Sequence, residues 1–403
     1  MAQHLQHELG APYKFAKHVQ CSMFDMHLKE YLNLVDEYEW TLEDAMENTI
    51  LCKEPIGVVG AITPWNWPLN AIVVKMIPAL LSGCTIVLKP SEVTPINAYL
   101  LSEAVEEANF PPGVYNMVCG TGSETASLFR KHPLVDMISF TGSTAVGATL
   151  VSTVQQRVRT ELGGKSATIV LDDAPEDRIR MILSDVLENS GQTCSALTRL
   201  IVPQHRLKEI NAIVKDVFES NCRVVDATDP TATLHDIGPL SSKTHWERVR
   251  NYIQIGMEQD GATLLAGGLK CPEDVHPHGY FVRPTAFTNV TNDMTIAREE
   301  IFGPVLSILS YDTIEQAIDT ANDTNYGLNN AIIGGDDDEH RMVQLAKQLK
   351  SGQVQINTRH PTSFLRVPFG GYKQSGDGRE HGIYGLEEYL QIKAINLPRN
   401  KKR

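Results

Sequence analysis

The sequence lacks the features that mark membrane, secreted and nucleic-acid-binding proteins. Its 403 residues include 36 lysines and arginines but 49 aspartates and glutamates, so the net charge of −13 excludes the basic surface of a nucleic-acid-binding protein. No apolar run approaches the ~20 residues of a membrane-spanning helix, and the stretch IGVVGAITPW (56–65) is interrupted by glycine, threonine and proline. The first ten residues, MAQHLQHELG, do not resemble a signal peptide.

Cysteine and histidine also lack the patterns of a disulfide framework or a metal site. The 7 cysteines are scattered without a Cys-x-x-Cys pair, and the 13 histidines show no metal-ligand spacing. An odd, unclustered set of cysteines is typical of a reducing compartment. We therefore predict a cytoplasmic protein that binds no metal, membrane or nucleic acid.

Two regions alternate short apolar runs with helical patterns. In the first, strands are predicted at 56–62, 84–90, 114–120 and 137–142, with helices at 68–83 and 95–110. In the second, which starts near residue 164, strands are predicted at 166–173, 199–203 and 353–357 and helices at 174–191, 207–218, 311–322 and 336–352. Strands joined by such helices form parallel sheets through right-handed crossovers. The predicted fold class is α/β, with a doubly wound parallel sheet.

The segment ENSGQTCSALTR (188–199) raises a question, because Cys194 lies among small and polar residues. Most cysteines in soluble proteins pack as small buried hydrophobic residues. Elsewhere, Glu161 precedes two glycines in ELGGK (161–165), and Asn66 follows a predicted strand in TPWNWPLN (63–70). A thiol nucleophile, a carboxylate base and an amide donor together suit attack on a carbonyl. Taken alone, each of the three residues is better explained by a structural role.

Seven motifs together occur in the order and approximate spacing of one enzyme family. They are TPWNWP (63–68), LKPSE (88–92), FTGST (140–144), ELGGK (161–165), NSGQTC (189–194), EEIFGP (299–304) and PFGGYKQSG (368–376). From about residue 8 to residue 395, the chain resembles the NAD(P)-dependent aldehyde dehydrogenase family. The resemblance implies a doubly wound cofactor domain, a second α/β catalytic domain and a small oligomerisation β-flap.

The resemblance also implies catalytic roles for three residues. Cys194 matches the nucleophile of the family, and Glu161 matches the general base that activates the deacylating water. Asn66 matches the side chain that holds the oxyanion together with the backbone N–H of the cysteine. The implied reaction oxidises an aldehyde to the carboxylic acid through a thiohemiacetal and a thioester on the cysteine.

The implied cofactor is a nicotinamide dinucleotide. Residues that match or adjoin the cofactor-binding positions of the family are Trp65, Lys89, Glu92, Gly122, Gly142, Ser143, Leu162, Glu300 and Phe302. A carboxylate such as Glu92 accepts hydrogen bonds from ribose hydroxyls but repels a 2′-phosphate. NAD is therefore favoured, with NADP as the alternative.

The loop near residue 360 contains charges whose role the sequence leaves open. Arg359, His360 and Arg366 occupy the position of the substrate-gating loop of the family, where they would favour an aldehyde that carries a carboxylate. Solvated loop charges are the simpler interpretation. Trp67 matches a position on the wall of the substrate tunnel, although a core aromatic residue is an equally good interpretation.

The resemblance implies domain boundaries and an oligomer. Residues 1–36 and 56–163 are assigned to the NAD-binding domain, 164–368 to the catalytic domain, and 369–385 to a segment that returns to the NAD-binding domain. Residues 37–55 and 386–397 match the oligomerisation strands, whose exposed edges favour pairing. We therefore expect a homodimer or a homotetramer.

The start of the chain creates a second functional hypothesis. Family members usually carry several tens of residues before the position of Met1, so this chain resembles an N-terminally short member. A missing layer would leave apolar sheet surface exposed. The first hypothesis is an active aldehyde dehydrogenase, and the alternative is a truncated, catalytically weak relative that acts as a structural or partner-binding subunit.

Overall fold

The computed structural model describes residues 1–46, 48–153, 156–359 and 364–398. The chain forms two compact units. Unit 1 comprises Met1–Gln20, Glu161–Phe364 and Gly370–Asp377, and unit 2 comprises Cys21–Thr160, Leu365–Phe369 and Gly378–Arg403. Within the described residues, no helix is both long and apolar enough to cross a membrane.

Residues 1–20 belong to unit 1, whereas the predicted NAD-binding domain includes residues 1–36. The contacts of this segment explain the difference. The Gln6 side-chain amide donates to the Ala227 carbonyl at 2.5 Å, and a β-carbon at Gly10 would lie 2.6 Å from the Pro239 ring. The functional domain boundaries stay predictions.

Unit 2 is built around a parallel sheet. Its strands follow the order β7-β6-β3-β4-β5, and β6, β3, β4 and β5 are mutually parallel. Ile62 pairs with both Lys89 and Phe140, so the carboxyl ends of three strands meet at one edge. The bounds are β3 (Val58–Ile62), β4 (Thr85–Lys89), β5 (Tyr115–Met117), β6 (Met137–Thr141) and β7 (Arg157–Glu161).

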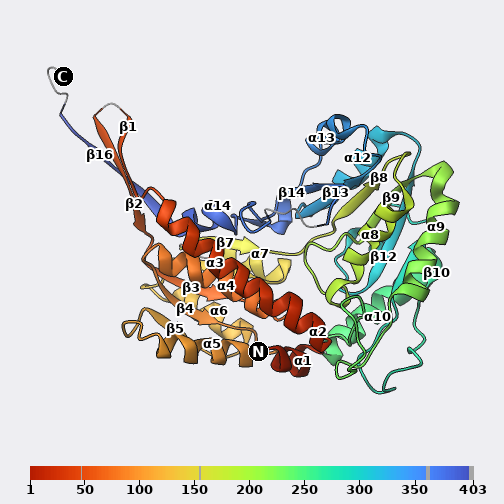
Figure 1. Ribbon diagram of the computed structural model, residues 1–403, viewed down its shortest axis with the longest axis horizontal. Helices are drawn as coiled ribbons and strands as arrows, with labels where there is room; N and C mark the ends of the chain where they lie inside the picture. The colour runs from red at the N-terminus through yellow and green to blue at the C-terminus, as the bar shows by residue number, and fades with distance from the viewer. Residues whose placement is uncertain (47, 154–155, 360–363, 399–403) are drawn as a thin grey trace. The chain divides into compact units, whose positions relative to one another are not determined.

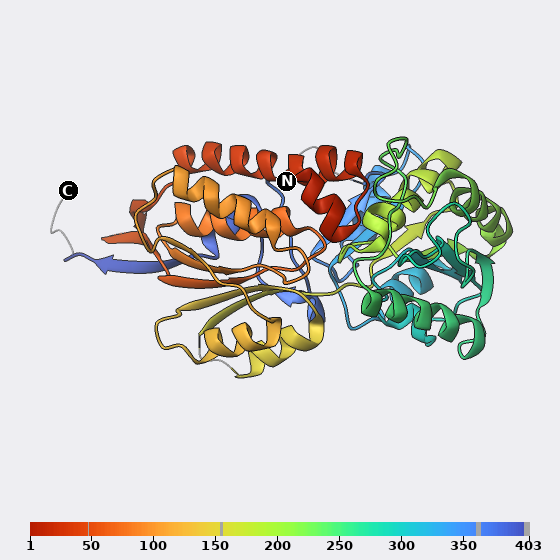
Figure 2. The ribbon, with the colours of Figure 1, turned by 90° about the horizontal axis from the view of Figure 1, so that it is seen from below.

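Helices cover both faces of this sheet, as Figure 2 shows. One face carries α3 (Cys21–Glu37), α4 (Pro68–Leu81) and α5 (Ile96–Glu107), and the other carries α6 (Gly122–Lys131) and α7 (Thr144–Thr153). Alternate strand residues such as Ile86 and Leu88 pack with Ile72 of α4 in one buried cluster. The doubly wound α/β fold that the sequence predicts is therefore confirmed.

Three further strands of unit 2 form a separate antiparallel sheet in the order β1-β2-β16. They are β1 (Thr41–Met46), β2 (Thr49–Pro55) and β16 (Leu390–Asn396), and Figure 1 shows them extending away from the helices of the unit. Beyond Leu390, the residues of β16 are exposed, including 69% of Ile392. This small sheet, here called the flap, lies where the sequence predicts oligomerisation strands.

Unit 1 contains a seven-stranded sheet in the order β10-β11-β12-β9-β8-β13-β14. Every neighbouring pair is parallel except β10 and β11. The strands are β8 (Ala167–Val170), β9 (Arg199–Pro203), β10 (Thr263–Ala266), β11 (Thr285–Thr288), β12 (Val305–Tyr311), β13 (Asn329–Ile333) and β14 (Gln353–Ile356).

Helices pack against the two faces of this sheet through two hydrophobic clusters. Leu200 and Val202 of β9 pack with α8 (Glu176–Leu187) and α9 (Leu207–Asp216). Ile201, which points the other way, packs with α10 (Lys243–Glu258), α12 (Ile314–Asn322) and α13 (Glu339–Ala346). The smaller elements of the chain are α1 (Ala2–Leu9), α2 (Tyr13–Phe15), α11 (Thr295–Arg298), β15 (Gly376–Asp377) and α14 (Gly382–Glu387).

Candidate active site

In unit 2, the predicted cofactor residues gather at the carboxyl edge of the parallel sheet. Asn66 follows β3, Lys89 ends β4, and Ser143 follows β6. Open α/β sheets bind their ligands at this edge. Asn66 is 5% exposed, so its amide is held in the interior of the unit near the end of β3.

Lys89 and Glu92 form an ion pair at this edge. The Lys89 Nζ lies 2.7 Å from Glu92 Oε2, and the backbone N–H of Gly122 donates to the other carboxylate oxygen at 3.4 Å. Burial opposes ionisation, but the hydrogen bonds, Lys89's first among them, lower the pKa of Glu92. Because 54% of the Glu92 side chain is exposed, its ionised carboxylate remains accessible to ribose hydroxyls.

The other predicted cofactor residues of unit 2 lie in turns beside these strands. The Trp65 carbonyl accepts a hydrogen bond from the Thr94 hydroxyl at 3.3 Å. A β-carbon at Gly142 would lie 2.6 Å from the Phe140 ring, so a larger residue here would have to displace that ring. Ser143 directly precedes α7, and its carbonyl accepts the N–H of Gly147 at 3.0 Å. Helix N-termini of this kind favour anions such as a pyrophosphate.

In unit 1, the two glycines of ELGGK lie between Cys194, the predicted nucleophile, and Glu300, a predicted cofactor residue. A β-carbon at Gly163 would lie 2.3 Å from Glu300 Oε2, and one at Gly164 would lie 2.4 Å from the carbonyl oxygen of Cys194. Both distances are too short for any side chain. Glu161 lies just before these glycines at the end of β7 and is 4% exposed. Leu162 is fixed by a 2.9 Å hydrogen bond from its N–H to the Ser375 carbonyl.

Glu300 is a partly buried residue whose carboxyl group packs against the glycine loop. Burial raises its pKa to about 7, and the hydrogen bond from the Gly164 N–H, 2.9 Å long, only partly offsets this effect. The same short contact fixes the position of the Glu300 carboxyl group relative to the glycine loop. Glu300 is therefore placed by the backbone that also packs against Cys194.

His245 is a residue at this site that the sequence interpretation missed. Its Nε2 lies 2.7 Å from the carbonyl oxygen of Phe302, whose φ of 65° is unusual for a residue other than glycine. Burial lowers the pKa of His245 to about 4, although the hydrogen bond to Phe302 opposes the shift. At neutral pH the ring is therefore uncharged and donates its single proton to the Phe302 carbonyl.

The loop around Cys194 is anchored by hydrogen bonds. The N–H of Leu197 donates to Asp185 Oδ2 of α8 at 3.1 Å, and the Asn329 amide donates to the Ser195 carbonyl at 3.1 Å. Cys194 itself is partly exposed and forms no disulfide. The thiol therefore lies on a loop that hydrogen bonds hold on its C-terminal side.

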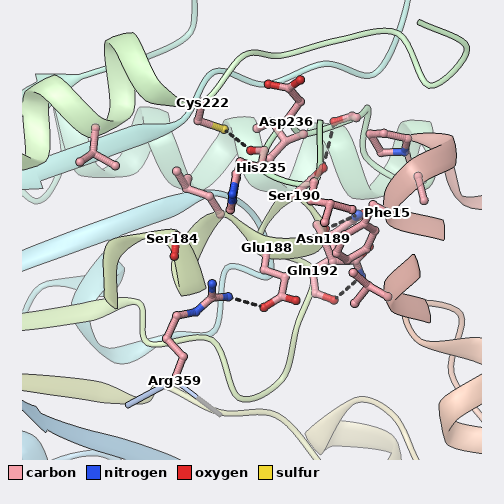
Figure 3. Close-up of a pocket in the computed structure, with 18 of the residues that line it drawn as sticks. Phe15, Ser184, Glu188, Asn189, Ser190, Gln192, Cys222, His235, Asp236 and Arg359 are labelled. Carbon is pink, nitrogen blue, oxygen red and sulfur yellow. Dashed lines mark hydrogen bonds and ion pairs between the residues drawn. The ribbon is translucent and has the colours of Figure 1, made fainter. Parts of the chain in front are cut away.

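The charges near residue 360 are in ion pairs. Arg359 Nη2 lies 2.6 Å from Glu188 Oε2, as Figure 3 shows, and Arg366 Nε lies 2.5 Å from Glu30 Oε1. His360 lies outside the described residues. Because both arginines are paired with carboxylates, the structure does not favour their use as a receptor for a carboxylate-bearing substrate. Trp67 is half-buried and immediately precedes α4.

The structure thus groups the predicted site residues by unit. Glu161, Leu162, Cys194, Glu300 and Phe302 belong to unit 1. The residues assigned to unit 2 are Trp65, Asn66, Lys89, Glu92, Gly122, Gly142 and Ser143. The functional roles of these residues stay predictions.

Comparison with known proteins identifies the family. The model of the aldehyde dehydrogenase family matches residues 1–395. The chain is 44% identical over 401 residues to 3-succinoylsemialdehyde-pyridine dehydrogenase of Pseudomonas sp.. This alignment covers 98% of this chain and 81% of the relative. The chain therefore belongs to the aldehyde dehydrogenase family, as the seven motifs predict.

Solved structures agree with this assignment. A mutant of aldehyde dehydrogenase C from Pseudomonas syringae, solved with NAD+ and octanal, is 40% identical and superposes with a TM-score of 0.92 over 98% of this chain and 80% of that one. The Mycobacterium tuberculosis aldehyde dehydrogenase, solved with NAD+, is 38% identical with a TM-score of 0.93 over 100% of this chain and 82% of that one.

Replacement of Gly164 by alanine is expected to impair the site directly. The added methyl group would meet the Cys194 carbonyl, so the loop that contains Cys194 must move. We expect a loss of aldehyde-oxidising activity of about tenfold or more, the effect of ~1.4 kcal/mol, measured as NADH formation at saturating substrate. Gly261→Asn is the control, because Gly261 has no atom within 4 Å of an added β-carbon. Equal activity in Gly164→Ala and the control would contradict the packing argument.

His245 is expected to make stability depend on pH. Its pKa is lowered from 6.5 to about 4 in the folded chain, so the unfolded chain binds the proton first as pH falls. The free energy of unfolding should therefore decrease between pH 6.5 and 4, by at most about 3 kcal/mol from this group. Urea unfolding across this range should show a smaller decrease for His245→Gln, which retains an N–H donor but does not titrate. Parallel curves for both proteins would refute the prediction.

Proposed function

We propose that this chain oxidises an aldehyde to the carboxylic acid with NAD and that Cys194 is the nucleophile. The observation that carries the proposal is the packing of the Gly163–Gly164 backbone against both the Cys194 carbonyl and the Glu300 carboxylate. This backbone continues directly from Glu161. A thiol, a carboxylate base and a cofactor-binding carboxylate are thereby linked through one short loop of unit 1.

The residues suit each step of the chemistry. The Cys194 thiolate adds to the aldehyde carbon, and the resulting alkoxide accepts hydrogen bonds from the Asn66 amide and the Cys194 N–H. When the carbonyl of this thiohemiacetal forms again, a hydride leaves and a thioester remains on the sulfur. Glu161 then takes a proton from water, and the hydroxide displaces the Cys194 thiolate to release the acid.

The cofactor assignment is supported by the residues at the carboxyl edge of unit 2 and by Glu300. When bound, the nicotinamide supplies the hydride acceptor. Lys89 and Glu92 would hold one ribose, the start of α7 would hold the pyrophosphate, and Glu300 would hold the second ribose. The ionised, exposed Glu92 favours NAD, because its charge would repel the 2′-phosphate of NADP. Two structural relatives were solved with NAD+.

The proposed substrate is an aldehyde, and the proposal does not specify the rest of the molecule. One relative is named for a pyridine semialdehyde, and one structure contains octanal. The aldehydes in these names therefore differ in the group attached to the carbonyl carbon. The ion pairs of Arg359 and Arg366 give no support to a carboxylate-bearing substrate. The alternative of a catalytically weak structural subunit is not favoured, because Cys194, Glu161 and Asn66 are all present.

We also propose a homodimer or homotetramer that assembles through the flap. The flap contains β16, whose residues after Leu390 are exposed and include the apolar Ile392 and Ile395. Exposed strands with apolar side chains favour pairing with another chain. The cytoplasmic location stays a prediction, consistent with seven cysteines that form no disulfide.

Replacement of Cys194 by serine tests the proposed nucleophile. A serine hydroxyl is far less acidic than a thiol and forms no thiolate, so we expect kcat to fall by about 10³-fold or more. The assay is steady-state NADH formation with a panel of aliphatic and aromatic aldehydes. Cys271→Ser is the matched control, since Cys271 is an exposed free thiol of the same unit. Full activity in Cys194→Ser would overturn the assignment.

Replacement of Glu92 by glutamine tests the proposed coenzyme preference. Without the negative charge, repulsion of a 2′-phosphate is lost, so the ratio of kcat/KM for NAD to that for NADP should fall by about tenfold, or ~1.4 kcal/mol. Glu106→Gln, an exposed glutamate of α5, provides the control. A ratio that does not change in Glu92→Gln would show that this carboxylate does not select the coenzyme.

A further inference from the structure

The backbone immediately before Cys194 has an unusual conformation. After α8 ends at Leu187, three consecutive residues adopt positive φ: Asn189 (53°), Ser190 (58°) and Gly191 (71°). A left-handed residue other than glycine costs about 1–3 kcal/mol. The loop that leads to the thiol therefore holds this shape only because its surroundings enforce it.

Side-chain amides within the loop provide part of this restraint. The Asn189 amide donates to the Gln192 carbonyl at 3.2 Å, and the Gln192 amide donates to the Asn189 carbonyl at 3.0 Å. The Gln192 amide oxygen also accepts the Ser241 N–H at 3.0 Å. Figure 3 shows Asn189, Ser190 and Gln192 side by side on the wall of a cavity of about 590 Å³. The two amides thus close the loop into a compact turn two residues before Cys194.

A residue from the start of the chain completes the network. Gln20 is 1% exposed, and its side-chain amide donates to the Asn189 amide oxygen at 3.2 Å. This hydrogen bond orients the Asn189 amide so that its nitrogen faces the Gln192 carbonyl. Gln20 and Asn189 are 169 positions apart in the sequence, yet both belong to unit 1.

The local backbone of Gln20 is itself irregular. Residues Ala16–Gln20 form a π-helical turn between α2 and α3. Such turns are rare and occur mostly as single insertions in helices, frequently at functional sites. Val19 of this turn and Phe15, the last residue of α2, also line the cavity on whose wall Asn189 and Gln192 lie. The irregular turn therefore brings a buried amide against the loop of the nucleophile.

We propose that Gln20 is a positioning residue for the Cys194 thiol and that it acts through Asn189. The amide of Gln20 fixes the Asn189 side chain, Asn189 fixes Gln192, and this turn sets the position of the thiol two residues later. The importance of this thiol rests on the proposed function, but its position does not. Removal of the Gln20 amide should therefore change the reactivity of Cys194 while the fold remains intact.

The test measures alkylation of Cys194 by iodoacetamide, followed by mass spectrometry of its peptide. The variants are Gln20→Met, Asn189→Gly and the double variant. Since one neutral hydrogen bond changes an equilibrium by about 2- to 10-fold, Gln20→Met should change the rate constant by roughly fivefold. In the Asn189→Gly background, Gln20→Met should have no further effect, because the amide through which it acts is gone.

Controls separate positioning from general destabilisation. Asn211→Leu removes a comparable side-chain hydrogen bond of unit 1, from Asn211 to the Thr288 hydroxyl at 2.9 Å, and should leave alkylation of Cys194 unchanged. Alkylation of the exposed Cys271 in each variant is the internal reference. Thermal unfolding verifies that every variant is folded at the assay temperature. If Gln20→Met does not fold, Gln20→Leu removes the same donor with another apolar side chain.

The outcomes are distinct. The proposal is overturned if the alkylation rate of Cys194 in the folded Gln20 variant stays within 1.5-fold of the original rate. It is also overturned if the rate change in the double variant is the product of the changes in the two single variants. Alkylation needs no aldehyde and no cofactor. A chain that oxidises no aldehyde but shows the expected coupling between Gln20 and Asn189 would therefore refute the proposed function and leave the positioning role supported.

Discussion

The close contact between the Gly163–Gly164 backbone and two other segments is the constraint on which the candidate site of unit 1 depends. One glycine leaves room only for the Glu300 carboxylate, and the next leaves room only for the Cys194 carbonyl. Because interiors are packed without spare volume, a side chain at either position would displace one of these groups. The glycines therefore set how closely the Cys194 loop approaches the Glu300 carboxylate, and Glu161 precedes them at the end of β7.

The two units collect their functional residues by different physical means. In unit 2, parallel pairing in register brings the ends of β3, β4 and β6 to one edge, so residues far apart in sequence lie near one another there. In unit 1, the residues lie on loops whose shape depends on individual hydrogen bonds. His245 holds the Phe302 carbonyl, and Asn329 holds the Ser195 carbonyl. We therefore expect a single substitution to displace the candidate site residues of unit 1 more than those of unit 2.

Much of the fold could be predicted from the sequence, because hydrophobic periodicity reports directly on burial. The α8 pattern, for example, identifies the buried face that Ile179 and Leu183 form. The sequence analysis did not assign α10, whose many polar residues mask its buried stripe. It also did not assign β12 and β13, although Gly303–Pro304 precedes the first and Gly334–Gly335 follows the second. The seven motifs identified the candidate site residues through family resemblance. Gln20 and His245 could not be found in this way, since their roles arise from contacts with backbone and amide groups that are distant in sequence.

The central claim is that aldehyde oxidation passes through a thioester on Cys194, and trapping of that thioester tests it most directly. In Glu161→Gln, the water that releases the acid is no longer activated, so the acyl group should remain on the enzyme. After incubation with NAD and each member of an aldehyde panel, mass spectrometry of the peptides should find one acyl group per chain, on Cys194, for every aldehyde that yields NADH. The account would be contradicted if NADH forms while the acyl group lies on another residue or Cys194 remains unmodified.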